Sequence, residues 1–285
     1  MFVRVAELTV SARREAAAAP AGTETKQGVG ATKAYRFKIQ VSPLDCTGCG
    51  NCANVCPAPT KALLMKPLES QLDKGEAERW EYMHNQVGYK DTVVDKTKTV
   101  KNSQFSRPLF EFSGACAGCG ETPYVKLITQ LFGERMLIAN ATGCSSIWGG
   151  SAPSMPYTTN KDGHGPAWAN SLFEDNAEYG LGMASAVKHM RNGLKDRLEN
   201  LKAIDASVAG VVDAWVETMN DGEASKEATK ALVAALEAYN GADAEAKNIV
   251  AYVLENKDQL AKKSQWIFGG DGASYDIGYG GLDHV

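Results

Sequence analysis

Four cysteines in one short run carry the clearest chemistry in this sequence. Cys46, Cys49, Cys52 and Cys56 have the spacing C-x2-C-x2-C-x3-C, and Pro57 follows the last of them. This is the ligand pattern of bacterial two-cluster ferredoxins, in which the fourth cysteine binds the other cluster. A zinc site or cysteines that only pack are the alternatives, but zinc ribbons separate two C-x2-C pairs by a longer loop. The run therefore predicts ligands of a 4Fe–4S cluster.

Three further cysteines form a second candidate set. Cys116 and Cys119 make another C-x2-C among small residues, directly before an expected helix whose N-terminus would favour thiolates and an anionic cluster. Cys144 follows an apolar run of strand length, at the end of a strand where parallel sheets bind ligands. Zinc binding and simple buried thiols remain alternatives for this set. The presence of the first motif favours a second iron–sulfur cluster.

A glycine turn near the C-terminus is a candidate diphosphate site. Gly270, Asp271 and Gly272 follow a short apolar strand. The glycines would let the backbone approach a diphosphate, and the aspartate would hold Mg²⁺. Because three residues are a weak signal, a plain tight turn remains the alternative.

Composition excludes some classes of function. The chain has 285 residues, with 44% hydrophobic and 22% charged residues and a net charge of −4. This charge gives no electrostatic case for nucleic-acid binding. No apolar run approaches the roughly 18 residues that a membrane span needs, and the N-terminus lacks the apolar core of a signal peptide. Seven cysteines in clustered ligand spacing indicate reduced thiolates and a cytoplasmic location.

Hydrophobic periodicity predicts the elements that position these residues. The predicted elements, in chain order, are a strand over 34–41, a short strand over 62–65, a helix over 123–132, a strand over 135–141, a loop over 148–176, helices from 177 to 263 and a strand over 265–268. We expect an α/β protein with a partial ferredoxin-like iron–sulfur domain over 1–68, a linker over 69–110 and a partial cofactor-binding α/β domain with a helical insertion over 111–285.

Together the motifs resemble the pyruvate:ferredoxin (flavodoxin) oxidoreductases, and the resemblance extends from about Tyr35 to Val285. Five ordered motifs carry it: 41–52 around the first cysteines, 112–124 around Cys116, 141–150 around Cys144, 165–176, and the glycine turn with 275–278. The resemblance implies that residues 111–285 belong to a thiamine-diphosphate domain.

The family resemblance implies roles for individual residues. Cys116, Cys119 and Cys144 would hold the cluster nearest thiamine diphosphate, and Glu121 would be a catalytic residue that contacts this cofactor, as Cys144 also would. Gly270, Asp271, Gly272 and Ala273 would lie along the diphosphate, with Asp271 on Mg²⁺. Family members often have an aromatic residue where this chain has Ala273, which puts one packing contact in question.

The resemblance also implies a reaction. The intact enzyme would convert pyruvate and coenzyme A to acetyl-CoA and CO₂, pass electrons through 4Fe–4S clusters to ferredoxin or flavodoxin, and form a homo-oligomer. Each cysteine set lacks one local ligand and both ends fall within expected domains, so we expect a fragment that is inactive alone. The alternative is a non-catalytic iron–sulfur electron carrier or interaction module.

Overall fold

The computed structural model describes residues 7–11, 18–89, 92–150, 155–270, 272–276 and 278–285. Its contacts divide the chain into two compact units, each of which joins separate stretches of sequence. Unit 1 is Met1–Glu134 with Gly143–Pro166, and unit 2 is Arg135–Thr142 with Ala167–Val285. The predicted bounds 1–68, 69–110 and 111–285 stay a prediction, and the observed division falls at other positions.

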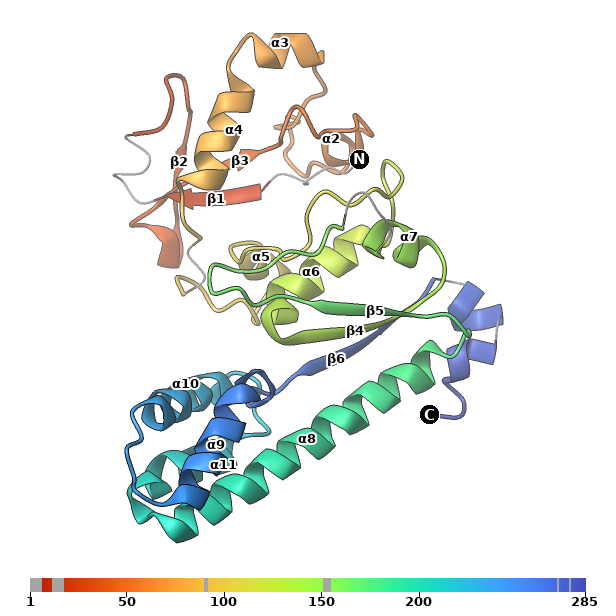
Figure 1. The fold of residues 1–285 in the computed structure, drawn as a ribbon. Coiled ribbons are helices and arrows are strands. Elements are labelled where there is room, and N and C mark those ends of the chain that lie inside the picture. Colours follow the sequence, from red (N-terminus) through yellow and green to blue (C-terminus); the bar gives the residue numbers. More distant parts are fainter. Residues whose placement is uncertain (1–6, 12–17, 90–91, 151–154, 271, 277) are drawn as a thin grey trace. The chain divides into compact units, whose positions relative to one another are not determined.

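Unit 1 contains a small antiparallel sheet and several short helices (Figure 1). Its elements are β1 (Glu7–Ser11), β2 (Lys26–Gln27), η1 (Gly30–Thr32), β3 (Arg36–Gln40), α2 (Asn51–Asn54), α3 (Leu68–Leu72), α4 (Glu76–Asn85), α5 (Val100–Ser103), α6 (Thr122–Phe132) and α7 (Cys144–Gly150). The sheet order is β1-β3-β2, so β3 is the central strand and leads directly into the first cysteine turn.

The predicted strand over 34–41 is present as β3, but its alternation differs from the expected one. Gln40 is buried, whereas the side chain of Ile39 is 48% exposed. The short strand expected over 62–65 is absent: among these described residues, 62 and 63 form a bend, 64 and 65 have no regular structure, and Leu64 and Met65 are exposed. The prediction was wrong because four apolar residues indicate a strand only where a neighbouring strand accepts their backbone hydrogen bonds.

The segment expected to be a linker contains regular structure. Helix α4 buries Trp80 and Met83, and Glu76 on the same helix pairs with Lys38 of β3 at 3.3 Å and with Arg79 at 2.7 Å. An ion pair and buried aromatic surface hold α4 against the sheet of unit 1. Residues 69–110 therefore include a packed part of this unit.

Helix α6 confirms the helix predicted over 123–132, with Glu121 immediately before it. Its buried residues include Val125 but also three polar residues, Thr122, Thr129 and Gln130. The amide of Gln130 donates to the carbonyl of Ser106 at 2.9 Å, which satisfies the buried polar group. The buried side of α6 therefore packs through hydrogen bonds as well as through apolar contacts.

Unit 2 is built on a parallel sheet. Its elements are β4 (Met136–Ala141), preceded by η2 (Gly133–Arg135), and β5 (Ala167–Ser171), α8 (Asn176–Ile204), η3 (Ala206–Val208), α9 (Ala209–Thr218), α10 (Ala224–Glu237), α11 (Ala244–Glu255), η4 (Lys257–Gln259), β6 (Ser264–Phe268), the π-helical turn η5 (Gly272–Asp276) and η6 (Gly278–Gly281). The order β5-β4-β6 places β4 in the centre, with both neighbours parallel to it. The strands predicted over 135–141 and 265–268 and the predicted α/β class are confirmed.

The loop predicted over 148–176 was too long. Helix α7 extends to Gly150, and β5 occupies 167–171 within the predicted loop. The sequence Ala-Trp-Ala-Asn-Ser lies among glycine, proline and serine, which hid the strand signal. Pairing with the buried central strand β4 stabilises β5 despite its mixed composition.

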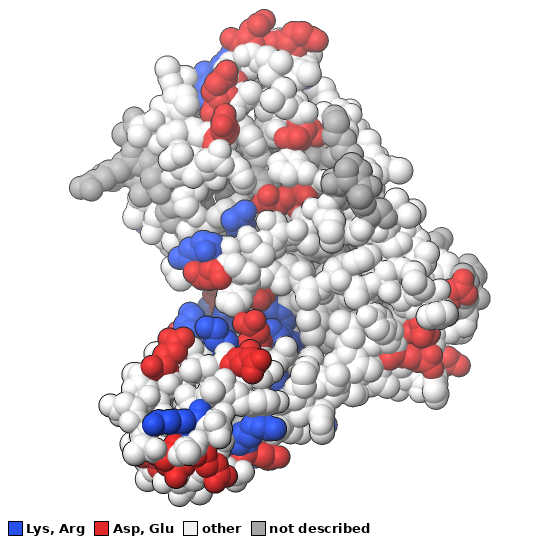
Figure 2. Space-filling view, viewed as in Figure 1, with Lys and Arg blue, Asp and Glu red and all other residues white. Residues whose placement is uncertain are grey.

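A helical bundle with its own core follows the sheet in unit 2. Figure 1 shows α9, α10 and α11 gathered beside the far end of α8. Leu198, Leu201 and Trp215 are almost completely buried in this core. Figure 2 shows basic and acidic side chains interspersed over the helical part on the side in view, as on a solvated surface. This confirms the predicted helices between 177 and 263.

Arg191 is a buried cation that the sequence pattern did not indicate. Its guanidinium donates to the carbonyls of Met219 at 2.5 Å, Leu260 at 3.0 Å and Gln259 at 3.2 Å. It also lies 6.0 Å from the centre of the Trp215 ring. These contacts connect α8 to the end of α9 and to the segment before β6.

Among the described residues, no helix combines the length and apolar character that a membrane span requires.

Candidate functional site

The first cysteine turn is built on two left-handed glycines. Gly48 has φ of 72° and Gly50 has φ of 79°, a conformation that other residues adopt at a cost. The N–H of Cys46 donates to the carbonyl of Ser42 at 3.1 Å, and Gly50 begins helix α2, which contains Cys52. The two glycines thus give the backbone between Cys46 and Cys52 two left-handed residues. Such a turn is typical of a backbone that wraps a compact inorganic group.

The chain after Cys56 folds back over its sulfur. The N–H of Ala62 donates to Cys56 Sγ at 3.4 Å. Backbone N–H groups, first among them that of Ala58, lower the pKa of the Cys56 thiol, and the charge of Lys61 contributes in the same direction. Because the thiolate is the form that binds iron, this environment fits a cluster ligand. All seven cysteines are free thiols.

The second cysteine turn lies beside the first within unit 1. Gly118, between Cys116 and Cys119, has φ of 73°, and the N–H of Cys119 donates to the carbonyl of Cys116 at 3.0 Å. A Cβ atom on Gly118 would lie 2.9 Å from the amide nitrogen of Asn51. The Asn51 side chain therefore reaches from the first cysteine turn to the backbone of the second. The fold brings together two cysteine motifs that are about 65 residues apart.

Glu121 carries a buried carboxylate oxygen that lacks a hydrogen-bond donor. Its Oε2 is buried and has no partner among the described residues. Three other buried groups also have no hydrogen-bond partner among the described residues: the hydroxyls of Ser113 and Ser145 and the indole nitrogen of Trp148. Leaving such groups unpaired costs free energy, so they indicate missing partners. All four residues lie within a few positions of Cys116, Cys119 or Cys144 in the sequence.

Cys144 is the first residue of helix α7, and its side chain is exposed. The hydroxyl of Ser146 donates to the carbonyl of Gly143 at 2.7 Å and accepts from the N–H of Gly143 at 2.9 Å. Trp148 packs edge-to-face on Phe110, with ring centres 5.4 Å apart. These contacts fix the start of α7 and thereby the position of Cys144.

Among the described residues, no three histidine, cysteine or acidic side chains lie close enough together to hold a metal ion. The structure therefore does not assemble three thiolates of either cysteine set around one point. It places Cys46, Cys49, Cys52, Cys56, Cys116, Cys119 and Cys144 all in unit 1.

The glycine turn of unit 2 follows the carboxyl end of β6. A Cβ atom on Gly269 would lie 3.1 Å from the Cβ of Ala273, a tight contact, and 3.5 Å from that of Ala141 in β4, an ordinary one. The carbonyl of Gly270 accepts from the N–H of Ser274 at 3.0 Å. A Cβ on Gly272 would meet open space. Asp271, the predicted Mg²⁺ ligand, lies outside the described residues, so the assigned metal role stays a prediction.

Ala273 lines a cavity of about 240 Å³ next to this turn, together with Gly269, Ile267 and Tyr279. The small side chain at position 273 leaves this space open, where an aromatic residue would project further. A cavity beside a glycine-rich turn at the end of a parallel strand fits a ligand of the diphosphate class.

Polar residues at the same edge of the sheet form a network that sequence reasoning missed. The amide of Asn170 donates to the Thr142 hydroxyl at 2.9 Å, and this hydroxyl donates to the carbonyl of Ser171 at 2.9 Å. Asn140 is fully buried, and its side-chain carbonyl oxygen has no partner among the described residues. The available signal was their position, since Asn140 and Asn170 each come one residue before a strand end.

Comparison with known proteins identifies the first cysteine turn. The family described as "4Fe-4S binding domain" matches residues 39–59, which contain Cys46, Cys49, Cys52 and Cys56. The chain thus contains a 4Fe–4S binding domain, as the cysteine spacing predicted.

Much longer curated proteins match nearly the whole chain. It is 54% identical to the pyruvate:ferredoxin oxidoreductase of Moorella thermoacetica over 94% of this chain and 23% of that protein. It is 52% identical to the pyruvate-flavodoxin oxidoreductase of Klebsiella pneumoniae over 94% of this chain and 22% of that protein. The chain is 45% identical to the pyruvate dehydrogenase [NADP(+)] of Cryptosporidium parvum over 88% of this chain and 14% of that protein. The chain therefore spans less than a quarter of these relatives.

Proposed function

Because 94% of this chain corresponds to a segment of pyruvate:ferredoxin and pyruvate-flavodoxin oxidoreductases, as its motifs indicated, we propose that it serves the same reaction. The full-length enzyme would oxidise pyruvate with coenzyme A to acetyl-CoA and CO₂ and reduce ferredoxin or flavodoxin. This segment would conduct electrons and hold part of the thiamine-diphosphate site. The enzyme would be a cytoplasmic homo-oligomer.

The main support for this proposal is that the two cysteine turns lie side by side within unit 1. Asn51 of one turn lies against Gly118 of the other, so clusters held there would be close neighbours. Cys46, Cys49 and Cys52 are proposed to hold one cluster, and Cys56 a neighbouring one. Cys116, Cys119 and Cys144 are proposed to hold the cluster that first receives electrons. Clusters of this type supply single-electron acceptors in series.

Glu121 is proposed as the catalytic residue of this segment. Its buried and unpaired Oε2 would accept a hydrogen bond from the organic part of the cofactor. Thiamine diphosphate, when bound, supplies the electron sink that release of CO₂ from a 2-oxoacid requires. The Glu121 carboxylate would hold the cofactor in one orientation, and water would be excluded from its buried oxygen. Cys144 would lie beside the same cofactor.

Gly270, Gly272 and Ala273 are proposed to receive the diphosphate, and Asp271 to hold Mg²⁺. The contact of Gly269 with Ala141 supports a turn that packs against the end of the sheet, where backbone N–H groups can face an anion. A cation held by one carboxylate together with phosphate oxygens and water is a common arrangement for Mg²⁺.

The variant Asp271→Ala in the full-length enzyme tests the thiamine site. We expect loss of measurable thiamine-diphosphate binding in a Mg²⁺ titration, with an unchanged iron and sulfide content. The variant Asp162→Ala, in an exposed turn of unit 1, is the control and should bind like the wild type. An unchanged dissociation constant in Asp271→Ala would leave the glycine sequence as a tight turn and favour an electron carrier without thiamine chemistry.

A further inference from the structure

A second cavity of unit 2 lies at the end of the sheet opposite to the glycine turn. Leu137 and Gln265, which pair in register near the amino ends of β4 and β6, line it. The glycine turn follows the carboxyl end of β6, so this cavity is distinct from the proposed diphosphate site. Its volume is about 380 Å³, at the lower end of the range for small-molecule sites.

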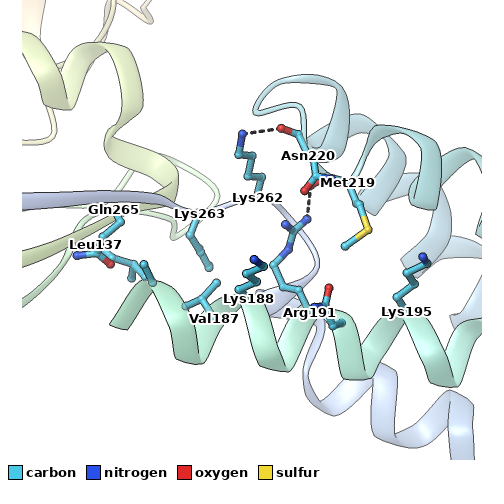
Figure 3. Close-up of a pocket in the computed structure, with 12 residues that line it drawn as sticks. Leu137, Val187, Lys188, Arg191, Lys195, Met219, Asn220, Lys262, Lys263 and Gln265 are labelled. Atoms are coloured by element: carbon cyan, nitrogen blue, oxygen red, sulfur yellow. Dashed lines mark hydrogen bonds between the residues drawn. The ribbon is translucent and has the colours of Figure 1, made fainter. Parts of the chain in front are cut away.

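Among the described residues that line this cavity, five are cations and none carries a carboxylate. Lys188, Arg191 and Lys195 follow one face of α8, and Lys262 and Lys263 come from the segment before β6 (Figure 3). We call these residues the cationic pocket. Apolar side chains of Leu137, Val187 and Met219 complete part of its wall. Like charges gathered in a hollow repel one another unless an anion joins them.

The charges of the cationic pocket are only partly compensated by the protein. The ammonium of Lys262 donates to the carbonyl of Asn220 at 2.5 Å, and the Arg191 guanidinium bonds carbonyls alone. Within the described part of the chain, neither Lys188 nor Lys195 forms an ion pair. Carbonyl groups satisfy hydrogen bonds but do not neutralise a positive charge.

Lys263 shows the electrostatic cost most clearly. Burial is the main reason that the pKa of its ammonium is lowered; the nearby carboxylate of Asp258 raises it and the charge of Arg191 lowers it. The charge of Lys262 contributes to lowering the pKa of the Asp221 carboxyl, which also accepts from the N–H groups of Glu223 and Ala224, so Asp221 compensates Lys262 only in part. A desolvated ammonium beside a buried guanidinium is unfavourable without a counter-ion.

We propose that the cationic pocket binds a small phosphorylated organic molecule through its phosphoryl oxygens. Phosphoryl groups carry several negative charges and several acceptor oxygens, which match a cluster of ammonium donors. The apolar wall would contact the organic part of the ligand. This site is independent of the proposed pyruvate chemistry, because none of its residues belongs to the cysteine turns or to the glycine turn.

Calorimetric titration of the 285-residue chain with ADP and with inorganic diphosphate tests the proposal. EDTA in the buffer removes Mg²⁺, on which the proposed thiamine-diphosphate site depends. We expect saturable binding at one site, which the double variant Lys188→Gln/Lys195→Gln weakens about tenfold for each lysine. The double variant Lys230→Gln/Lys247→Gln removes the same charge from exposed positions of α10 and α11 and should bind like the wild type.

A second variant separates binding from folding. Lys263→Met removes the desolvated cation, so its unfolding temperature without ligand should equal or exceed that of the wild type. Diphosphate should raise the unfolding temperature of the wild type and raise that of the variant much less. Absence of saturable binding of both probes, equal losses in the two double variants, or an equal diphosphate effect in Lys263→Met would each overturn the proposal.

Discussion

At the residue scale, the cysteines were identifiable because their ligand role depends on spacing, which the sequence displays directly. The state of Glu121 was not identifiable in that way. Its importance was implied by family resemblance alone, and the structure adds that its Oε2 is buried with no donor from the part of the chain that is described. Burial of one oxygen depends on side chains from distant parts of the chain. Local sequence carries no signal for it.

Replacement of Glu121 should weaken cofactor binding in the full-length enzyme. Glu121→Ala removes the acceptor oxygen, and we expect thiamine-diphosphate affinity to fall about tenfold to a hundredfold, the usual worth of a hydrogen bond to a charged group. Glu121→Gln keeps one oxygen at the same position and should retain more affinity. Calorimetric titration with thiamine diphosphate and Mg²⁺ measures both.

Glu134→Gln, a change of the same kind in the same unit, serves as the control and should leave cofactor affinity unaltered. If Glu121→Ala binds thiamine diphosphate as tightly as the wild type, the buried oxygen has another purpose and the catalytic assignment fails.

At the element scale, the long periodic segments were predictable and the short ones were not. Helix α6 and the helices after residue 176 have clear patterns because each buries one side along many residues, and β4 is a nearly continuous apolar run because both of its faces are buried. Strand β5 was missed because pairing with β4, rather than its own composition, stabilises it. The expected strand at 62–65 failed for the converse reason, since apolar residues there lack a partner strand among the described residues.

The helical bundle of unit 2 should be sensitive to loss of a single core side chain. Leu198 has no exposed surface, so Leu198→Ala should lower the free energy of unfolding by about 3 kcal/mol, through lost burial and the cavity left behind. Met190, on the same helix, is 42% exposed, and Met190→Ala should cost about 0.5 kcal/mol or less. Urea unfolding followed by circular dichroism compares them, and equal losses would contradict the assigned core.

Asp221 should make the start of α10 sensitive to acid. Its carboxylate accepts from the N–H groups of Ala224 and Glu223, and these bonds lower its pKa. The ionised form is therefore favoured in the folded state, and the stability it contributes is present at neutral pH and lost as the pH falls through the lowered pKa. The wild type should unfold at a higher temperature than Asp221→Ala at pH 7.

The same thermal measurement at low pH provides the check on Asp221. As the pH falls from the ordinary range of a carboxyl pKa through the lowered pKa of Asp221, the difference between the wild type and Asp221→Ala should shrink. A difference that stays constant from pH 7 to pH 3 would mean that the charge of Asp221 does not stabilise the helix.

At the scale of the whole molecule, the sequence predicted the α/β class, the 4Fe–4S domain and the order of the motifs. It did not predict that residues 1–134 and 143–166 form one unit, since that depends on contacts such as Asn51 with Gly118 between distant segments. The cationic pocket was equally hidden. Its lysines come from two segments about 70 residues apart in the sequence, helix α8 and the segment before β6.

In the proposed enzyme, the first cysteine turn conducts electrons away from chemistry that the second cysteine turn supports. The direct measurement is electron paramagnetic resonance of anaerobic full-length enzyme carrying Cys46→Ser, after addition of pyruvate and coenzyme A, combined with the rate of ferredoxin reduction. We predict that a pyruvate-reduced cluster signal persists while ferredoxin reduction falls sharply. If the signal and the reduction are both lost in a folded enzyme, or if ferredoxin is reduced at the wild-type rate, the account is contradicted.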